Sequence, residues 1–271
     1  MLLLVRYSEI GLKSKPVRRM FEMQLKDNMM SMLSRDGIEA IVTPAGSRFY
    51  VESEDLDKAA DSLRRVFGVA SLSKAAVCGS EMDDICKAAA EYSQGRIGPG
   101  LSFAVRARRE GTHKYTSMDL GREAGSAIFL SNTDIRVNLT DPDVTFYIEV
   151  RNNAAYIFHE YLSGPGGLPL GCQGKVIANV DNERGLLSAW MMMKRGCRAI
   201  VCGSYDVSML ERYDPSLRTA EAGETVNGIL GKVSGISVDE LDSVTVGDVP
   251  VYFPTIGMID TEVKEMLNSI R

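Results

Sequence analysis

Residues 163–174 read Ser-Gly-Pro-Gly-Gly-Leu-Pro-Leu-Gly-Cys-Gln-Gly, and this stretch divides the chain into two parts of different character. Because Gly and Pro interrupt regular secondary structure, we predict a linker over 164–174. The residues that follow read as a strand (175–180), a helix (181–195) and a second strand (198–203). A strand, a helix and a strand in this order predict a parallel sheet, and therefore a small Rossmann-like α/β domain over 175–271.

The chain before residue 78 follows another pattern. Five apolar residues spaced four apart predict a long helix with one buried face, namely Val17, Phe21, Leu25, Met29 and Leu33. A strand is predicted before this helix and a hairpin after it, and a second helix and a fourth strand complete the order βαββαβ. That order is the ferredoxin-like split unit, so we predict an α+β, ferredoxin-like domain over 1–77.

Residues 78–163 predict a second α+β domain. One helix is expected to begin at Met82, and a second is expected to begin with Ser117 as its cap. Between these helices, apolar residues alternate with Arg106 and Arg108, which predicts a strand with one basic face. Three further strands are predicted, over 136–139, 144–150 and 154–160.

The composition is that of an ordinary globular protein of 271 residues, with 45% hydrophobic and 25% charged residues. No apolar run is long enough to span a membrane, and the start of the chain lacks the features of a signal peptide. Five cysteines form no Cys-x-x-Cys pair and only two histidines are present, so no metal site is expected. An odd number of cysteines without a secretion signal favours reduced thiols and a cytoplasmic protein.

The formal net charge of −5 argues at first against a nucleic-acid ligand, but the charges are unevenly placed. Residues 1–26 hold six basic and two acidic residues, and residues 102–122 hold five basic and two acidic ones. Residues 164–271 hold ten basic and fourteen acidic residues. A nucleic acid is attracted by a local basic face and not by the net charge, so both basic segments are candidate nucleic-acid contacts. For either segment alone, the simpler interpretation is a charged surface exposed to solvent.

The segment 102–117 combines the features of an RNA contact. A basic strand edge leads into a turn with amide donors and then into a helix N-terminus, and both arginines and helix N-termini bind phosphates. Tyr115 is expected to stack on an unpaired base. The candidate RNA-binding residues are Lys13, Lys15, Arg18, Arg19, Arg106, Arg108, Arg109, His113, Lys114, Tyr115, Ser117 and Arg122.

Candidates for other chemistry are weaker. The Gly-rich linker matches neither a Walker loop nor a dinucleotide-binding loop, because Pro169 stands where each needs a glycine. His113 and His159 have no placed partner and are interpreted as structural. Cys197 and Cys202 flank a predicted strand. Buried packing is the simpler interpretation of these two thiols, and a reactive sulfur carrier is the alternative.

Four motifs follow one another along the first 171 residues. They are Arg6-Tyr7-Ser8-Glu9-Ile10-Gly11-Leu12-Lys13, Phe67-Gly68-Val69-Ala70-Ser71, Phe103-Ala104-Val105-Arg106-Ala107-Arg108-Arg109 with His113 and Ser117, and Gly164-Pro165-Gly166-Gly167-Leu168-Pro169-Leu170-Gly171. In this order they resemble the tRNA 4-thiouridine synthetase (tRNA sulfurtransferase) family. The resemblance implies a ferredoxin-like domain and a THUMP RNA-binding domain that together face the acceptor end of tRNA. It also implies a PP-loop catalytic domain that uses ATP.

The third domain departs from that family. The family's PP-loop reads Ser-Gly-Gly-x-Asp-Ser, and the downstream match at residues 189–196 sets the register. The corresponding positions here are Val180, Asp181, Asn182, Glu183, Arg184 and Gly185. Asp181 and Glu183 would put carboxylates at a helix N-terminus, where they favour the helix but repel phosphate. The domain is also shortened, since Ala222-Gly223-Glu224 follows early and no cysteine lies beyond Cys202. We therefore expect a degenerate PP-loop domain without a nucleotide.

Three functions remain open at this point. The first is a tRNA-binding protein that has lost its adenylation site, with a sulfur-donor protein and a second copy of the chain as possible further partners. The second is an active sulfurtransferase, which would need ATP and Mg²⁺ in a non-standard loop. The third is a small-molecule binder that uses the crevice of the α/β domain. None of the three involves a membrane.

Overall fold

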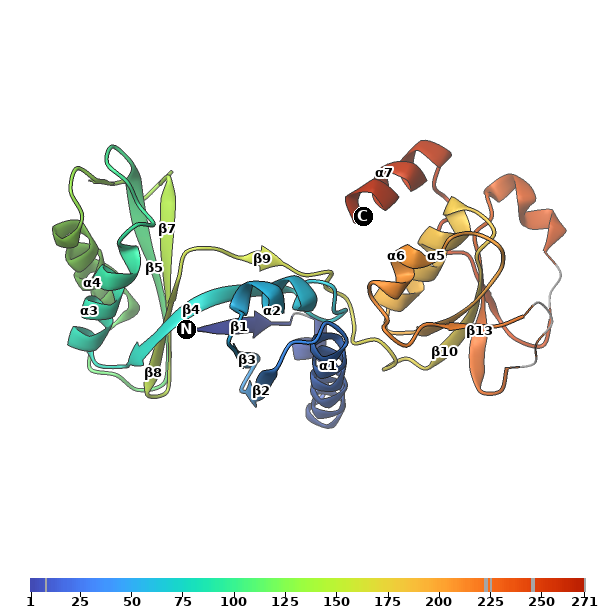
Figure 1. Ribbon diagram of the computed structural model, residues 1–271, viewed down its shortest axis with the longest axis horizontal. Helices are drawn as coiled ribbons and strands as arrows, with labels where there is room; N and C mark the ends of the chain where they lie inside the picture. Colours follow the sequence, from blue (N-terminus) through green and yellow to red (C-terminus); the bar gives the residue numbers. More distant parts are fainter. Residues whose placement is uncertain (8, 222–223, 225, 245–246, 271) are drawn as a thin grey trace. The chain divides into compact units, whose positions relative to one another are not determined.

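The computed structural model describes residues 1–7, 9–221, 224, 226–244 and 247–270 (Figure 1). Ser8 of the first family motif lies outside these residues, as do Ala222 and Gly223. The described chain forms two compact units. The first consists of Met1–Val5, Tyr50–Leu56 and Leu72–Leu162, and the second consists of Arg6–Phe49, Asp57–Ser71 and the residues from Ser163 onward.

The N-terminal elements follow the predicted βαββαβ order. They are β1 (Leu2–Arg6), η1 (Glu9–Leu12), α1 (Lys15–Arg35), β2 (Ala40–Ala45), β3 (Arg48–Ser53), α2 (Leu56–Leu63) and β4 (Ser71–Gly79). Four of the five predicted stripe residues on α1 are buried. The exception is Val17, which lies in the first turn and is 36% exposed. The ferredoxin-like prediction for this part of the chain is confirmed.

The elements after β4 continue the same sheet. They are α3 (Met82–Ser93), β5 (Ser102–Glu110), α4 (Ser117–Ser131), β6 (Arg136–Val137), β7 (Val144–Arg151), β8 (Ala154–Phe158) and β9 (Leu162–Ser163). The strand order is β2-β3-β1-β4-β8-β7-β5-β6, with β9 on β4. β5 runs parallel to β7, whereas β7 and β8 are antiparallel. In Figure 1, α3 and α4 cover one face of these strands, and Leu120, Ala124 and Ile128 of α4 are buried there.

The start of α4 differs from the sequence prediction. Thr116, not Ser117, is the N-cap: its side chain accepts from the Asp119 amide at 3.1 Å, and the Asp119 carboxylate accepts from the Thr116 amide at 3.0 Å. The prediction placed the cap one residue late, because Thr116 and Ser117 are adjacent and both residue types are good caps. Aspartate completes the same reciprocal pair one residue earlier.

The C-terminal elements form the predicted parallel α/β domain. They are β10 (Lys175–Asn179), α5 (Glu183–Lys194), β11 (Arg198–Cys202), α6 (Ser208–Glu211), β12 (Arg218–Thr219), β13 (Ile229–Ser234), η2 (Val238–Ser243), β14 (Val251–Tyr252) and α7 (Asp260–Ile270). The strand order is β12-β11-β10-β13-β14, and every neighbouring pair is parallel. β11 and β12 lie on one side of β10, and β13 and β14 lie on the other. Where the strand order reverses in this way, the connections leave in opposite directions and open a crevice at the carboxyl ends of β10 and β13.

The linker glycines allow close backbone approaches. A Cβ atom on Gly167 would lie 2.1 Å from the Lys194 carbonyl oxygen, and one on Gly164 would lie 2.3 Å from that of Val69. Any larger residue at either position would force the backbone apart. Within the described ranges, no helix is both long and apolar enough to cross a membrane.

Candidate nucleic-acid interface

Strand β5 presents alternate side chains to its two faces, as the sequence predicted. Arg106 and Arg108 are exposed, whereas Val105 and Ala107 pack partly against α4. Arg106 is held in place because its Nη2 donates to the Leu139 carbonyl at 2.6 Å. The basic face of the strand is therefore available to a ligand, and one of its guanidiniums is already ordered.

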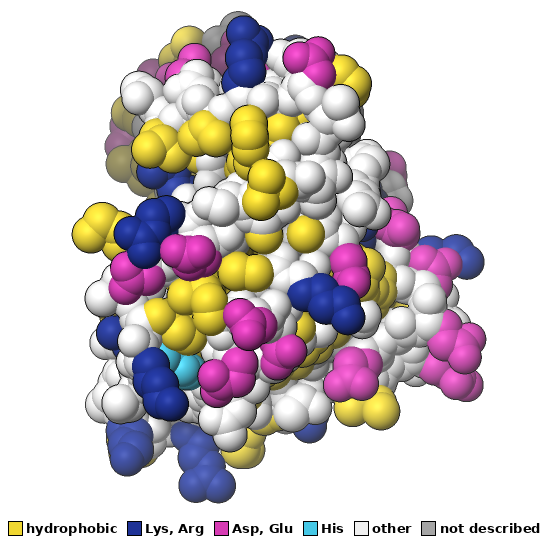
Figure 2. Space-filling model, turned by 90° about the vertical axis from the view of Figure 1, so that its left-hand side faces the viewer, with side chains coloured by type: hydrophobic (Ala, Val, Ile, Leu, Met, Phe, Trp, Pro, Cys, Tyr) yellow, Lys and Arg dark blue, Asp and Glu magenta, His cyan; other side chains and the backbone are white. Residues whose placement is uncertain are grey.

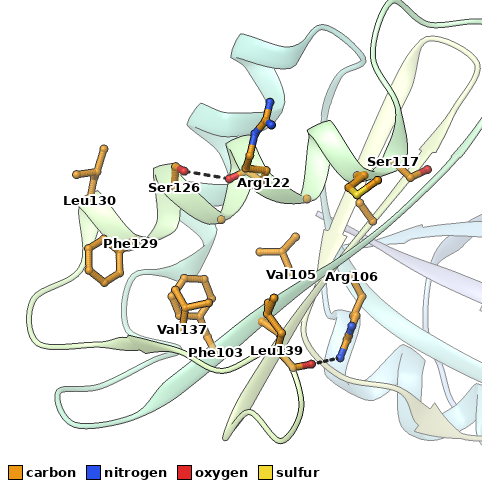
Figure 3. Close-up of a pocket in the computed structure, with 15 residues that line it drawn as sticks. Phe103, Val105, Arg106, Ser117, Arg122, Ser126, Phe129, Leu130, Val137 and Leu139 are labelled. Atoms are coloured by element: carbon orange, nitrogen blue, oxygen red, sulfur yellow. Dashed lines mark hydrogen bonds between the residues drawn. The ribbon is translucent and has the colours of Figure 1, made fainter.

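A hollow of about 710 Å³ lies between α4 and β5, bordered on one side by β6 and the residues that follow it (Figure 3). Its lining is mostly apolar and includes Phe103, Val105, Phe129, Val137 and Leu139. Helix α4 contributes Gly121 and Gly125, where an added Cβ would meet only ordinary contacts at 3.7–4.0 Å. These glycines are thus not required by steric clash. Their effect is to leave the hollow open.

Two cations border this hollow in different ways. Figure 3 shows Arg106 reaching toward the Leu139 carbonyl, whereas the Arg122 guanidinium points away from the space between helix and strand. Arg122 instead lies 3.2 Å from the Glu123 carboxylate and 3.6 Å from that of Asp119, and these pairs are exposed. Exposed pairs are weak, so Arg122 remains able to turn toward a phosphate.

The turn between β5 and α4 is organised by His113 and Tyr115. Their rings stack at a centroid distance of 5.4 Å, and the Tyr115 hydroxyl donates to the Ser80 carbonyl at 2.6 Å. Burial raises the pKa of Tyr115. Arg109 donates to the Gly111 carbonyl at 3.0 Å within the same turn, and Lys114 is exposed. One face of the Tyr115 ring is therefore already covered by an imidazole.

The candidate basic residues of the first segment lie on α1 and, in the case of Lys13, just before it. Lys13, Lys15 and Arg19 are exposed. Arg18 differs, because it is 2.8 Å from the Glu22 carboxylate and donates to the Tyr7 hydroxyl, which itself donates to Glu22. Burial and Glu22 raise the pKa of Tyr7 to about 12. Arg18 therefore belongs to a local network, and the other three side chains are the freer cations.

Figure 2 shows hydrophobic, acidic and basic side chains exposed together on one face of the molecule, with several Lys and Arg side chains along its lower edge. The exposed apolar residues of α4 are Met118, Phe129 and Leu130, which are 83%, 46% and 84% exposed. All three line the hollow.

Residues 180–185, which the sequence register aligns with the PP-loop, form a helix start whose amides are partly capped. The Asn182 side chain accepts from the Gly185 amide at 2.9 Å, and the Asp181 carboxylate accepts from the Ser204 amide at 3.1 Å. A Cβ on Gly185 would lie 2.6 Å from the Asn179 carbonyl oxygen, which explains the glycine at this position. The amide at the start of α5 thus already has an acceptor within the chain.

Arg184 is turned away from the loop. Its side chain is buried and donates at 2.8 Å to each of the Thr255 and Met258 carbonyls, and at 2.6 Å to the Asp260 carboxylate. Arg184 therefore does not offset the charge of a neighbouring carboxylate in the loop, because its guanidinium is bonded to Thr255, Met258 and Asp260. The crevice beside it is lined by four further carboxylates, those of Asp181, Glu183, Asp239 and Glu240.

Burial favours the protonated form of the cysteine thiols in this fold. Burial raises the pKa of Cys197 and Cys202, and it raises the pKa of Cys172 to about 11. Cys197 is buried, and its Arg195 neighbour only partly opposes the effect of burial. No group of three or more potential metal ligands occurs among the residues that the structure describes.

These observations define a class of protein in which a ferredoxin-like domain and a helix-covered mixed sheet precede a parallel α/β domain. The model of the ThiI ferredoxin-like domain matches residues 2–73, and that of the THUMP domain matches residues 79–160. The chain belongs to the ThiI family of tRNA sulfurtransferases. The resemblance inferred from the four sequence motifs is thereby confirmed.

Curated relatives match most of this chain but a smaller share of their own. A probable tRNA sulfurtransferase of Methanobrevibacter smithii is 38% identical over 203 residues, which are 73% of this chain and 52% of that protein. One from Methanosarcina acetivorans is 40% identical over 71% of this chain and 48% of its own. One from Halobacterium salinarum is 35% identical over 82% of this chain and 62% of its own. The chain spans about half the length of the first two.

Two solved structures share the fold over nearly the whole chain. PH1313 from Pyrococcus horikoshii has a TM-score of 0.84 at 26% identity, with 99% of both chains covered. A 4-thiouridine synthetase, solved as an RNA complex with bound ATP, has a TM-score of 0.82 at 21% identity, with 99% of this chain and 84% of that one covered.

Proposed function

We propose that this chain binds tRNA through its ferredoxin-like and THUMP domains, and that its α/β domain lacks the family's ATP-dependent adenylation site. The main observation in support of tRNA binding is the hollow between α4 and β5. It combines apolar walls with the ordered Arg106 guanidinium at its border.

The size and lining of the hollow suit an unpaired nucleotide. Sites for small organic groups commonly measure about 300–1,000 Å³, and the hollow falls within that range. Proteins that read unpaired RNA hold the base against apolar or aromatic side chains and hold its phosphate with Arg or Lys. Here Phe129 and Met118 supply the apolar contact, and Arg106 supplies the phosphate contact.

Further cations would hold the RNA backbone. Arg108 on β5, Lys114 in the turn after it and Arg122 on α4 are exposed. Lys13, Lys15 and Arg19 are exposed on the ferredoxin-like part. Such contacts orient an RNA without reading its sequence. Arg18, Arg109, His113, Tyr115 and Ser117 contribute less directly in this proposal, because their side chains shape the local turns or helix starts.

The second half of the proposal rests on charge and on hydrogen bonding. A triphosphate needs free amide donors and a positive field, and a helix N-terminus normally supplies both. Here Asn182 occupies the Gly185 amide, and Arg184 is engaged with Thr255, Met258 and Asp260. The carboxylates of the crevice would repel the phosphates. We therefore assign no residue of this chain to the binding of ATP or Mg²⁺.

The binding test uses a fluorescent tRNA and measures its anisotropy at low salt. Wild-type protein is expected to bind, and Arg106→Gln is expected to bind about tenfold more weakly, as the loss of one charge-assisted contact implies. Lys87→Gln removes the same charge from an exposed position on α3 and serves as the matched control. Absence of tRNA binding by the wild type at low salt would refute the proposal.

Calorimetry with ATP and Mg²⁺ tests the adenylation site separately. No heat of binding is expected with or without tRNA. Saturable binding that disappears in Asn182→Ala would instead support the alternative of an active sulfurtransferase with a non-standard loop. A sulfur-donor protein and a second copy of this chain remain predicted partners, and size-exclusion chromatography of the protein with and without tRNA tests the second.

A further inference from the structure

A second hollow, of about 720 Å³, lies within the second unit and shares no residue with the α4–β5 groove or with the crevice at the start of α5. Its border includes Arg64 and Arg65 after α2, Lys194 near the end of α5, and Arg212 after α6. Asp61 is the single carboxylate among the described residues that line it.

The positive charge around this hollow is only partly neutralised. Arg65 is paired with Asp36, whereas the Arg64 guanidinium is 4.0 Å from the exposed Asp61 carboxylate and donates its Nε to the Ser163 carbonyl. The Lys194 ammonium lies over the Trp190 ring, 5.1 Å from its centroid, and no carboxylate of the described chain pairs with it. Arg64, Lys194 and Arg212 thus border one hollow, and an anion bound between them would lower the repulsion among their like charges.

Two aromatic side chains, Trp190 and Tyr213, line the hollow. Trp190 is buried, with ring centroids 5.5 Å from Phe67 and 6.0 Å from Tyr213. Its indole Nε1–H is buried, and its neighbour is the Tyr213 hydroxyl, whose pKa is raised by burial and lowered in part by a hydrogen bond from the indole. Trp190 and Tyr213 thus line the hollow beside the cations, and an anion there would be held by the cations at its border.

We propose that this hollow binds a phosphate group, held by the Arg64 and Arg212 guanidiniums and the Lys194 ammonium. Guanidinium groups suit phosphate because their fork of N–H donors matches two of its oxygens. The phosphate can belong to an RNA backbone or to a free small molecule, since both present the same oxygens. The inference goes beyond the proposed tRNA groove and does not depend on it.

Trp190 is the only tryptophan in the chain, so its fluorescence reports on this hollow alone. Inorganic phosphate, inorganic pyrophosphate and tRNA are titrated separately into the full chain. At least one of these probes is expected to cause a saturable change in emission. In the double variant Arg64→Gln/Arg212→Gln the affinity is expected to fall at least tenfold, while Lys87→Gln keeps the wild-type affinity.

Comparing the three probes shows whether the bound phosphate belongs to a free anion or to RNA. The same experiment can fail or succeed independently of the tRNA proposal. A response to phosphate or pyrophosphate supports a free anion, and a response to tRNA alone supports an RNA backbone. Arg106→Gln leaves the phosphate response unchanged, because Arg106 belongs to the other unit. Either of two results overturns the inference: no probe gives a saturable change, or the double variant, shown by circular dichroism to be folded, responds like the wild type.

Discussion

At the scale of single residues, Arg184 shows how one side chain decides the character of a site. It is buried and satisfies two backbone carbonyls as well as Asp260. We expect Arg184→Ala to lower the free energy of unfolding by about 2–4 kcal/mol, because both carbonyls lose their donor in a buried setting. Urea unfolding measures this. Asp260→Asn is the matched control and should cost below about 1 kcal/mol, since Asp260 is exposed. Equal effects of the two would contradict this interpretation.

The cysteines provide a second residue-scale prediction. Burial raises the pKa of the Cys197 and Cys202 thiols, so the protonated form is favoured in the folded state. Iodoacetamide at about pH 8, near the ordinary thiol pKa, should therefore label both thiols more slowly in the folded protein than in urea. The stability that these protonated thiols contribute is present below the unfolded-state pKa and is lost as the pH rises above it. Mass spectrometry measures the rate of labelling at each thiol. Labelling of either thiol as fast in the folded protein as in urea would support the alternative of a reactive sulfur carrier.

At the scale of elements, helix α4 depends on its cap and on its glycines. Thr116→Ala removes the acceptor for the Asp119 amide and should cost about 1 kcal/mol of stability in thermal or urea unfolding. Ser117→Ala is the control, since Ser117 is the first residue of the helix and not its cap. A larger effect at Ser117 would contradict the observed capping pair.

The groove on the same helix has its own test. Gly125→Leu should fill the space between α4 and β5 and weaken tRNA binding at least tenfold, because a Leu side chain at this lining position would extend into the hollow. Gly125→Ala is the control, since its Cβ would meet the Val105 side chain at an ordinary 3.7 Å. Binding and thermal unfolding are measured on both variants. Unchanged binding by folded Gly125→Leu would exclude the groove as the RNA contact.

At the scale of the whole molecule, the net charge of −5 is the sum of unevenly distributed basic and acidic residues. The basic segments belong to the ferredoxin-like and THUMP parts, and most of the acidic excess belongs to the α/β domain. We expect tRNA affinity to fall steeply with salt, since bound cations release counterions. In Arg106→Gln/Arg108→Gln the slope of log K against log salt should become shallower by roughly 2, about 1 for each lost contact. An unchanged slope would show that the RNA lies elsewhere.

Much of the fold was predictable from local patterns. The four-residue spacing of apolar side chains marked α1, alternation marked β5, and the Gly-rich linker separated the mixed sheet from the parallel one. These features follow from the periods of helix and strand, which any single segment expresses without its neighbours. The cap of α4 was misplaced by one residue, because Ser and Thr are adjacent there and both are good caps.

The sequence by itself determined the order of elements, the family of the first two domains, and the chemical identity of residues 180–185. Only the tertiary structure decided where Arg184 points, that Arg18 is tied to Glu22 and Tyr7, and that Arg64, Lys194 and Arg212 surround one hollow. These arrangements join residues up to about 150 positions apart, from Arg64 to Arg212. Local periodicity carries no information about such pairs. They are set by how helices and strands pack, and packing depends on the whole chain at once.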